Sequence, residues 1–184
     1  MRLKGKTAFI TGGNSGIGLA TAKLFVAEGA RVAITGRDQA RLDAAVKELG
    51  PNGFGIKADA TDVAQLEGAV EQAVTKFGKL DIVFANAGIA GNTPVGGTTL
   101  AAFENVIKTN LTAVFFTVQA AVAHLNDNGS IILNGSVISV LGNPGYSAYA
   151  ATKAGVRAMA RVMASELSPR VAGERGRERC CSMV

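Results

Sequence analysis

TGGNSGIG at residues 11–18 lies between a short apolar run, residues 7–11, and the start of a helical pattern. Gly12 permits a sharp exit from a strand, Gly16 lets the backbone approach a pyrophosphate closely, and Gly18 lets a helix lie tight on a sheet. The free N–H groups at the helix start and the helix dipole would then face the phosphates. The loop predicts a dinucleotide site, and the competing interpretation is a plain turn between strand and helix.

Short apolar runs typical of buried strands alternate with longer helical patterns along the rest of the chain. The expected strands are residues 7–11, 31–35, 55–58, 80–85 and 130–133. The expected helices are residues 17–28, 38–49, 62–77, 100–125 and 148–167. This alternation predicts one α/β domain over residues 1–168: a doubly wound, Rossmann-like parallel sheet with helices on both faces.

The helical pattern at residues 100–125 is apolar around more of its circumference than a sheet-covering helix requires. We therefore expect its second face to pack against another subunit, which predicts a homo-oligomer. The alternative is an ordinary sheet-covering helix with an excess of Ala.

Composition excludes several other classes of protein. The chain has 184 residues, 48% of them hydrophobic and 18% charged, which is typical of a packed globular domain. We find no apolar run long enough to span a membrane, no secretory signal and only two cysteines, so we expect a cytoplasmic protein. The net charge of +5 is scattered rather than gathered in a basic stripe, so we expect no nucleic-acid partner. With a single His, we expect no metal.

Tyr149 and Lys153 are four residues apart in the last predicted helix, so they share one helix face. A free phenol has a pKa of about 10, which is too high for efficient proton exchange at neutral pH. A neighbouring ammonium favours the phenolate, which is a physical reason to pair the two groups. The bland alternative is an incidental Tyr–Lys pair on a solvated helix face.

The glycine loop and the Tyr–Lys pair together identify the chain as resembling the short-chain dehydrogenase/reductase family. The glycine spacing is Gly-x3-Gly-x-Gly, and the sequence YAATK occupies residues 149–153. Further matches are Asn86-Ala87-Gly88 after the fourth strand, Asn110 in the long helix and Ser136 after the fifth strand. The resemblance covers residues 5–168.

The resemblance implies an oxidoreductase that transfers a hydride between a nicotinamide cofactor and a carbonyl/alcohol substrate. It assigns Tyr149 as the general acid/base on the substrate oxygen and Lys153 as the holder of the nicotinamide ribose. It gives Ser136 the task of orienting the substrate oxygen. It gives Asn110 a water that links Lys153 to solvent. By the same resemblance, the helices at residues 100–125 and 148–168 would form the interface of a homodimer or homotetramer.

The cofactor is expected to be NADP(H) rather than NAD(H). Gly36 stands where the resemblance places an aspartate in NAD-using members, and Arg37 can pair with a 2′-phosphate. Two residues favour NAD(H) instead. By the resemblance, Ser15 stands where some NADP-using members have a second basic residue, and Asp38 lies beside Arg37. The full set of expected cofactor-binding residues is Gly12, Asn14, Ser15, Gly16, Ile17, Gly18, Arg37, Asp59, Ala60, Asn86, Ala87, Gly88, Tyr149 and Lys153.

Residues 169–184 depart from the family pattern. We see no strand pattern or apolar face there, so we expect an aberrant, basic, disordered tail in place of the last strands of the family. The alternative is a short natural tail. This departure raises a second hypothesis for function: a truncated, weakly active or inactive family member that serves as a nucleotide-binding or dimerising module.

Overall fold

A computed structural model describes residues 1–167 and 181–183 of the chain. Six parallel strands form one sheet in the order β3-β2-β1-β4-β5-β6. The strands are β1 Thr7–Ile10, β2 Arg31–Gly36, β3 Gly53–Lys57, β4 Leu80–Ala85, β5 Leu125–Leu133 and β6 Cys181–Met183. The helices are α1 Gly16–Ala27, α2 Gln39–Leu49, α3 Val63–Phe77, α4 Leu100–Ile107, α5 Ala113–Val122 and α6 Ser147–Leu167.

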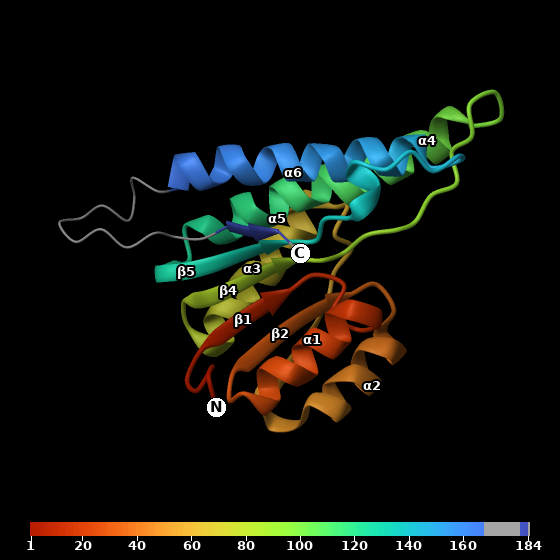
Figure 1. The fold of residues 1–184 in the computed structure, drawn as a ribbon. Helices are drawn as coiled ribbons and strands as arrows, with labels where there is room; N and C mark the ends of the chain where they lie inside the picture. The colour runs from red at the N-terminus through yellow and green to blue at the C-terminus, as the bar shows by residue number, and fades with distance from the viewer. Residues whose placement is uncertain (168–180, 184) are drawn as a thin grey trace.

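The predicted doubly wound α/β fold is confirmed. Helices α1 and α2 cover one face of the sheet, and α3, α5 and α6 cover the other (Figure 1). All four residues of β1 are buried, and the side chains of its last three alternate between two apolar clusters. Phe9 packs with the α3, α5 and α6 side, whereas Ala8 and Ile10 pack with the α1 and α2 side. Burial on both faces explains why the strands are continuous apolar runs.

Two helix starts predicted from the sequence are confirmed in atomic detail. The Asp38 carboxylate accepts a hydrogen bond from the Arg41 backbone N–H at 3.0 Å and caps α2. The Asp62 carboxylate does the same for the Gln65 N–H at 3.1 Å and caps α3. Each cap satisfies a first-turn donor that has no partner inside its helix.

The helix expected at residues 100–125 is shorter and interrupted. It consists of α4, a π-helical segment Lys108–Thr112 and α5, and it ends at Val122. Leu125 instead begins β5, where it pairs with Leu80 and is buried in the sheet. The sequence Asn-Asp-Asn-Gly that follows Leu125 forms helices poorly, so the helix does not extend to Leu125, and this residue pairs with a neighbouring strand instead.

The absence of a strand in the tail was predicted wrongly for residues 181–183. They form β6, which pairs in parallel with Ile131–Leu133 of β5. Without β6, β5 would be an edge strand with unpaired backbone groups, and such an edge accepts a segment without a strong strand pattern of its own. The disorder expected for the rest of the tail falls on residues 168–180 and 184, which lie outside the described residues.

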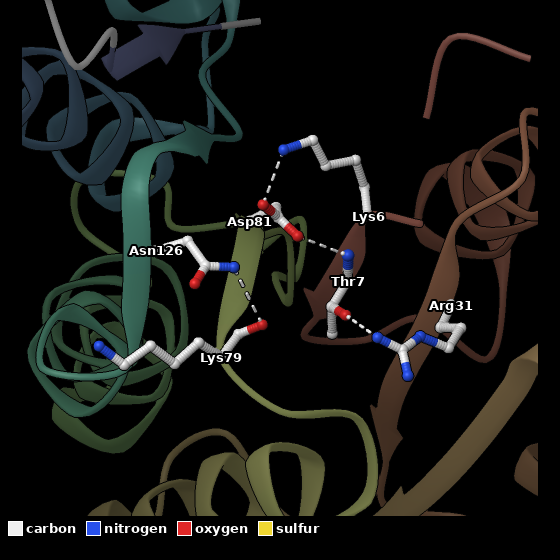
Figure 2. Close-up of polar contacts among 6 residues, drawn as sticks. All are labelled: Lys6, Thr7, Arg31, Lys79, Asp81 and Asn126. Carbon is white, nitrogen blue, oxygen red and sulfur yellow. Dashed lines mark hydrogen bonds and ion pairs between the residues drawn. The ribbon is translucent and has the colours of Figure 1, made fainter. Parts of the chain in front are cut away.

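A polar cluster ties the strands together at their amino ends, at the edge opposite the glycine loop (Figure 2). Asp81 accepts hydrogen bonds from the Lys6 Nζ and the Thr7 backbone N–H, both at 2.9 Å. Arg31 donates to the Thr7 Oγ1 at 3.2 Å. Partial burial raises the pKa of Asp81, but the hydrogen bonds from Lys6 and Thr7 outweigh it, so the net pKa lies below its usual value.

Within the described residues, no helix has the length and apolar character needed to cross a membrane. The same part of the chain contains no cluster of three or more His, Cys, Asp or Glu side chains suited to a metal ion.

Candidate active site

A cleft of about 380 Å³ opens at the carboxyl ends of the strands. The loops after β1, β2, β3 and β4 line it, and α6 supplies a further wall. Most of the residues expected to bind the cofactor line this cleft: Gly12, Asn14, Ser15, Gly16, Ile17, Arg37, Asp59, Ala60, Asn86, Ala87, Gly88, Tyr149 and Lys153. Three predicted site residues are not among its lining residues: Gly18, Asn110 and Ser136.

The glycine loop has the geometry of an anion cradle. Gly12 and Gly16 have φ angles of 63° and 52°, in the left-handed region that favours glycine. A side chain at Gly16 would meet no atom within 4 Å, so the space above this residue is open toward the cleft. Ser15, at the N-cap position of α1, makes no side-chain capping bond, which leaves the helix N-terminus available. These features fit a bound pyrophosphate.

Gly18 lies behind the loop rather than in the cleft. A Cβ there would lie 2.4 Å from the Gly12 carbonyl oxygen, so Gly18 allows α1 to approach the loop itself. Sequence reasoning missed Gly13, where a Cβ would lie 2.5 Å from the Ile34 Cγ2. The adjacent pair of glycines was the available signal for this close contact with β2.

Asn86 braces the loop from the neighbouring strand. Its Nδ2 donates to the carbonyl oxygens of Thr11 at 3.0 Å and Gly12 at 3.2 Å. In return, the Thr11 Oγ1 accepts from the backbone N–H groups of Asn86 and Ala87, both at 3.1 Å. Thr11 was not singled out from the sequence, although a threonine that ends a strand before a glycine loop is a recognisable signal. These bonds hold the loops after β1 and β4 in one arrangement.

The end of β2 places a cation, rather than a carboxylate, at the cleft. Arg37 lines the cleft and is exposed, and Gly36 beside it is buried beneath Asn14. A Cβ on Gly36 would lie 2.4 Å from the Asn14 Nδ2, so an aspartate there would displace the Asn14 amide. Asp38 is engaged as the cap of α2 and also pairs with Arg41 at 3.7 Å.

Asp59 forms an ordered carboxylate beside this cation. Its Oδ1 accepts from the backbone N–H and the hydroxyl of Thr61, both at 2.9 Å. Partial burial raises the pKa of Asp59, but these hydrogen bonds and the charges of Arg37 and Lys108 outweigh it and hold the pKa below its usual value. Thr61, which also lines the cleft, was missed by sequence reasoning.

Lys153 and Tyr149 lie on the same face of α6, as their spacing predicts. Lys153 is only 4% exposed, and burial lowers its pKa relative to a free lysine. Its Nζ donates to the Asn134 carbonyl oxygen at 2.7 Å and lies 5.7 Å from the centre of the Tyr149 ring. The ammonium is thereby held at the inner wall of the cleft.

Asn134 joins the two halves of the site and was not predicted. Besides accepting from Lys153, it donates from its Nδ2 to the Asn86 Oδ1 at 3.2 Å. Since Asn86 also holds the glycine loop, one chain of hydrogen bonds connects Lys153 to that loop. The only signal in the sequence was a polar residue at the end of an apolar strand.

Asn110 is fully buried in the π-helical segment. Its Oδ1 accepts from the Ile89 N–H at 2.8 Å, and its Nδ2 donates to the Ile89 carbonyl at 2.7 Å. The amide therefore clamps the loop after β4. The water expected beside Asn110 stays a prediction.

Ser136 follows β5 at the carboxyl edge of the sheet. Its Oγ accepts from the Ile138 N–H at 3.3 Å and caps a short 3-10 turn, Val137–Ser139. Its predicted contact with a substrate oxygen stays a prediction.

Comparison with known proteins assigns this arrangement to a family. The family model described as short chain dehydrogenase matches residues 6–172. The chain belongs to the short-chain dehydrogenase/reductase family. It is therefore an NAD(P)-dependent oxidoreductase by family, which confirms the resemblance inferred from its motifs.

Three relatives illustrate the match. The oxidoreductase asL5 of Sarocladium schorii is 46% identical over 168 residues, which are 90% of this chain and 68% of that protein. The 3-oxoacyl-(acyl-carrier-protein) reductase FabG of Thermotoga maritima is 40% identical over 177 residues, 92% of this chain and 71% of that protein. A short chain dehydrogenase of Burkholderia cenocepacia J2315, solved in complex with NADP, superposes with a TM-score of 0.88 at 37% identity, covering 92% of this chain and 71% of that one.

Proposed function

We propose that this short-chain dehydrogenase/reductase transfers a hydride between NADP(H) and a carbonyl/alcohol substrate. The observation that carries the proposal is that Tyr149 and Lys153 line the same cleft as the glycine loop. A proton-exchanging phenol thus stands beside a site built for a dinucleotide.

The roles proposed for the chain's own groups are those that the family resemblance implies. When bound, the nicotinamide supplies the hydride. The Tyr149 phenol gives a proton to the substrate oxygen in reduction and accepts it in oxidation. The Lys153 ammonium donates to the nicotinamide ribose hydroxyls. Ser136 orients the substrate oxygen through its hydroxyl.

The preference for NADP(H) is supported by the end of β2. Arg37 offers a guanidinium that matches a 2′-phosphate bidentately, and Gly36 leaves no carboxylate to repel it. Asp38 does not oppose this, because its carboxylate caps α2. By the family resemblance, Asp59 and Ala60, which both line the cleft, would contact the adenine.

The substrate is proposed to be uncharged. The two segments that flank the carboxyl ends of β4 and β5, residues 87–99 and 134–148, contain no Asp, Glu, Lys, Arg or His. Several of their large apolar side chains are exposed: Val95, Val137, Val140, Leu141 and Tyr146. The Tyr146 ring lies 6.3 Å from the Tyr149 ring. A carboxylate or phosphate would find no counter-charge on either segment, so a neutral ketone or aldehyde fits better.

The direct test follows NADPH oxidation with a panel of neutral ketones and aldehydes. The parent chain is expected to turn over, Tyr149→Phe is expected to abolish turnover, and Tyr146→Phe is the matched control. NADPH binding without turnover on any carbonyl would contradict the proposed activity. It would instead support the second hypothesis, an inactive nucleotide-binding module.

The chain is further proposed to form a homodimer or homotetramer through α4, α5 and α6. Each of these helices carries a partly exposed large apolar side chain, namely Phe103, Phe115 and Val162. Helices α5 and α6 cover the same face of the sheet (Figure 1). Light scattering at micromolar concentration should give at least twice the 18.8 kDa of one chain, and Val162→Glu should lower that mass.

A further inference from the structure

The first turn of α6 has a buried donor that its own helix cannot satisfy. Tyr149 is the third residue of this helix. The first N–H groups of any helix lack intrahelical acceptors, and a side chain at the N-cap position usually accepts from one of them. Here the preceding residue is Tyr146, whose side chain is not of the capping type. Ala148 is 0% exposed, so water cannot serve its N–H.

Thr93 supplies the missing acceptor from a distant part of the chain. Its Oγ1 accepts from the Ala148 N–H at 3.0 Å, and Thr93 itself is only 3% exposed. Its own N–H donates to the Gly145 carbonyl at 2.6 Å, and it forms a parallel β-bridge with Tyr146. The backbone and the side chain of Thr93 thus both hold the N-terminus of α6.

The loop that carries Thr93 is also held at its other end. It begins after β4 with residues that line the cleft, and the Asn110 amide clamps it at Ile89. Four residues after Ile89, Thr93 reaches α6. The loop therefore spans from the cofactor cleft to the first turn of the helix that presents Tyr149.

We propose that Thr93 is a positioning residue: its hydroxyl caps α6 from another loop and thereby orients the Tyr149 phenol toward the cleft. Thr93 touches no reacting atom in this role and acts through Ala148 and the first helical turn. The inference rests on the proposed function in that it assumes Tyr149 exchanges the proton.

Three variants separate positioning from general stability. Thr93→Val keeps the shape of the side chain and removes the acceptor, whereas Thr93→Ser keeps the hydroxyl. Thr99→Val is the matched control, because Thr99 caps α4 through the Ala102 N–H at 3.2 Å and α4 presents none of the proposed reacting groups. If Thr93→Val is insoluble, Thr93→Ala removes the same acceptor without added bulk.

In NADPH oxidation, Thr93→Val should lower kcat about tenfold or more, because small displacements of reacting groups are costly. Thr93→Ser and Thr99→Val should keep kcat within about twofold of the parent. Binding of 2′,5′-ADP, which occupies only the adenine end, should be unchanged in every variant. An unchanged kcat in Thr93→Val, or an equal loss of 2′,5′-ADP binding, would overturn the proposal.

A second readout does not need turnover, so it separates this inference from a failure of the proposed activity. Hydrogen exchange of the peptide that spans residues 145–152 should accelerate about tenfold in Thr93→Val, because the Ala148 donor loses its partner. The same peptide should be unaffected in Thr93→Ser and Thr99→Val. Unchanged exchange in Thr93→Val would show that the hydroxyl does not hold the first turn, and the inference would be wrong.

Discussion

Replacing Arg37 by Gln should convert a preference for NADPH into near indifference between NADPH and NADH. Arg37 is exposed at the cleft, where we expect it to bind the 2′-phosphate, and Gly36 provides no opposing group. A hydrogen bond to a charged group is worth about 1.5–3 kcal/mol. Because 1.4 kcal/mol corresponds to a factor of ten, the NADPH dissociation constant should rise about 10- to 150-fold.

The NADH dissociation constant should change by no more than about twofold, since NADH lacks the phosphate that the guanidinium would bind. Both constants can be measured from the enhancement of nicotinamide fluorescence on binding. Arg41→Gln is the matched control, because Arg41 is also exposed but belongs to the cap of α2 and does not line the cleft. The difference between NADPH and NADH in the parent should shrink as salt is raised, because exposed charges are screened.

One result would refute the reasoning directly. If Arg37→Gln weakens NADPH and NADH by the same factor, Arg37 supports the loop and does not read the phosphate. An unchanged NADPH dissociation constant would remove Arg37 from the cofactor site altogether.

The other predictions concern a buried lysine, a partly buried carboxylate and a glycine at a close contact. Lys153→Met should abolish most turnover while the unfolding free energy at pH 7 changes by no more than about 1 kcal/mol. Burial lowers the pKa of Lys153, so its charged form destabilises the folded protein at neutral pH. In thermal melts, the melting temperature of the parent should therefore rise relative to that of Lys153→Met as pH rises toward about 10.4. Asp81→Asn should cost about 1–3 kcal/mol at pH 7. Because the pKa of Asp81 is lowered, the stability difference between the parent and Asp81→Asn should be complete above about pH 3.9 and should fade as pH falls through the folded-state pKa. Thermal melts over a range of acidic pH values would measure this change. Glu104→Gln is the control, because Glu104 is exposed. Gly36→Asp should weaken both cofactors because its Cβ displaces Asn14, and the double variant with Asn14→Ala should recover NADH binding; tight NADH binding by the single variant would contradict this.

Local patterns in the sequence were enough to predict five of the six strands and most of the proposed cofactor-binding residues that line the cleft. Strand β1 is a run of buried side chains because both faces of a parallel sheet are covered, and such a run is visible without a structure. The Gly12 and Gly16 positions were equally visible, because only glycine adopts their positive φ angles without strain. The spacing of Tyr149 and Lys153 is set by the helix period alone.

The ends of elements depended on distant partners. Leu125 looks like the last residue of a long helix, yet pairing with Leu80 assigns it to β5. The strand at Cys181–Met183 has little pattern of its own, and its pairing with β5 defines it. In both cases a backbone ladder between segments far apart in sequence outweighs a weak local preference.

The hydrogen bonds that hold the site together were likewise beyond the reach of the sequence. Thr93 meets Ala148 across 55 positions, and Asn134 meets Asn86 across 48. Residue type shows only that such side chains can donate and accept, whereas the crossing of loops at the carboxyl edge of the sheet selects their partners. The sequence by itself therefore indicated most, but not all, of the chemical groups that reach the cleft. The tertiary structure decided which of these groups are held by hydrogen bonds and which residues are their partners, because a buried polar group bonds to whatever segment the fold brings within about 3 Å.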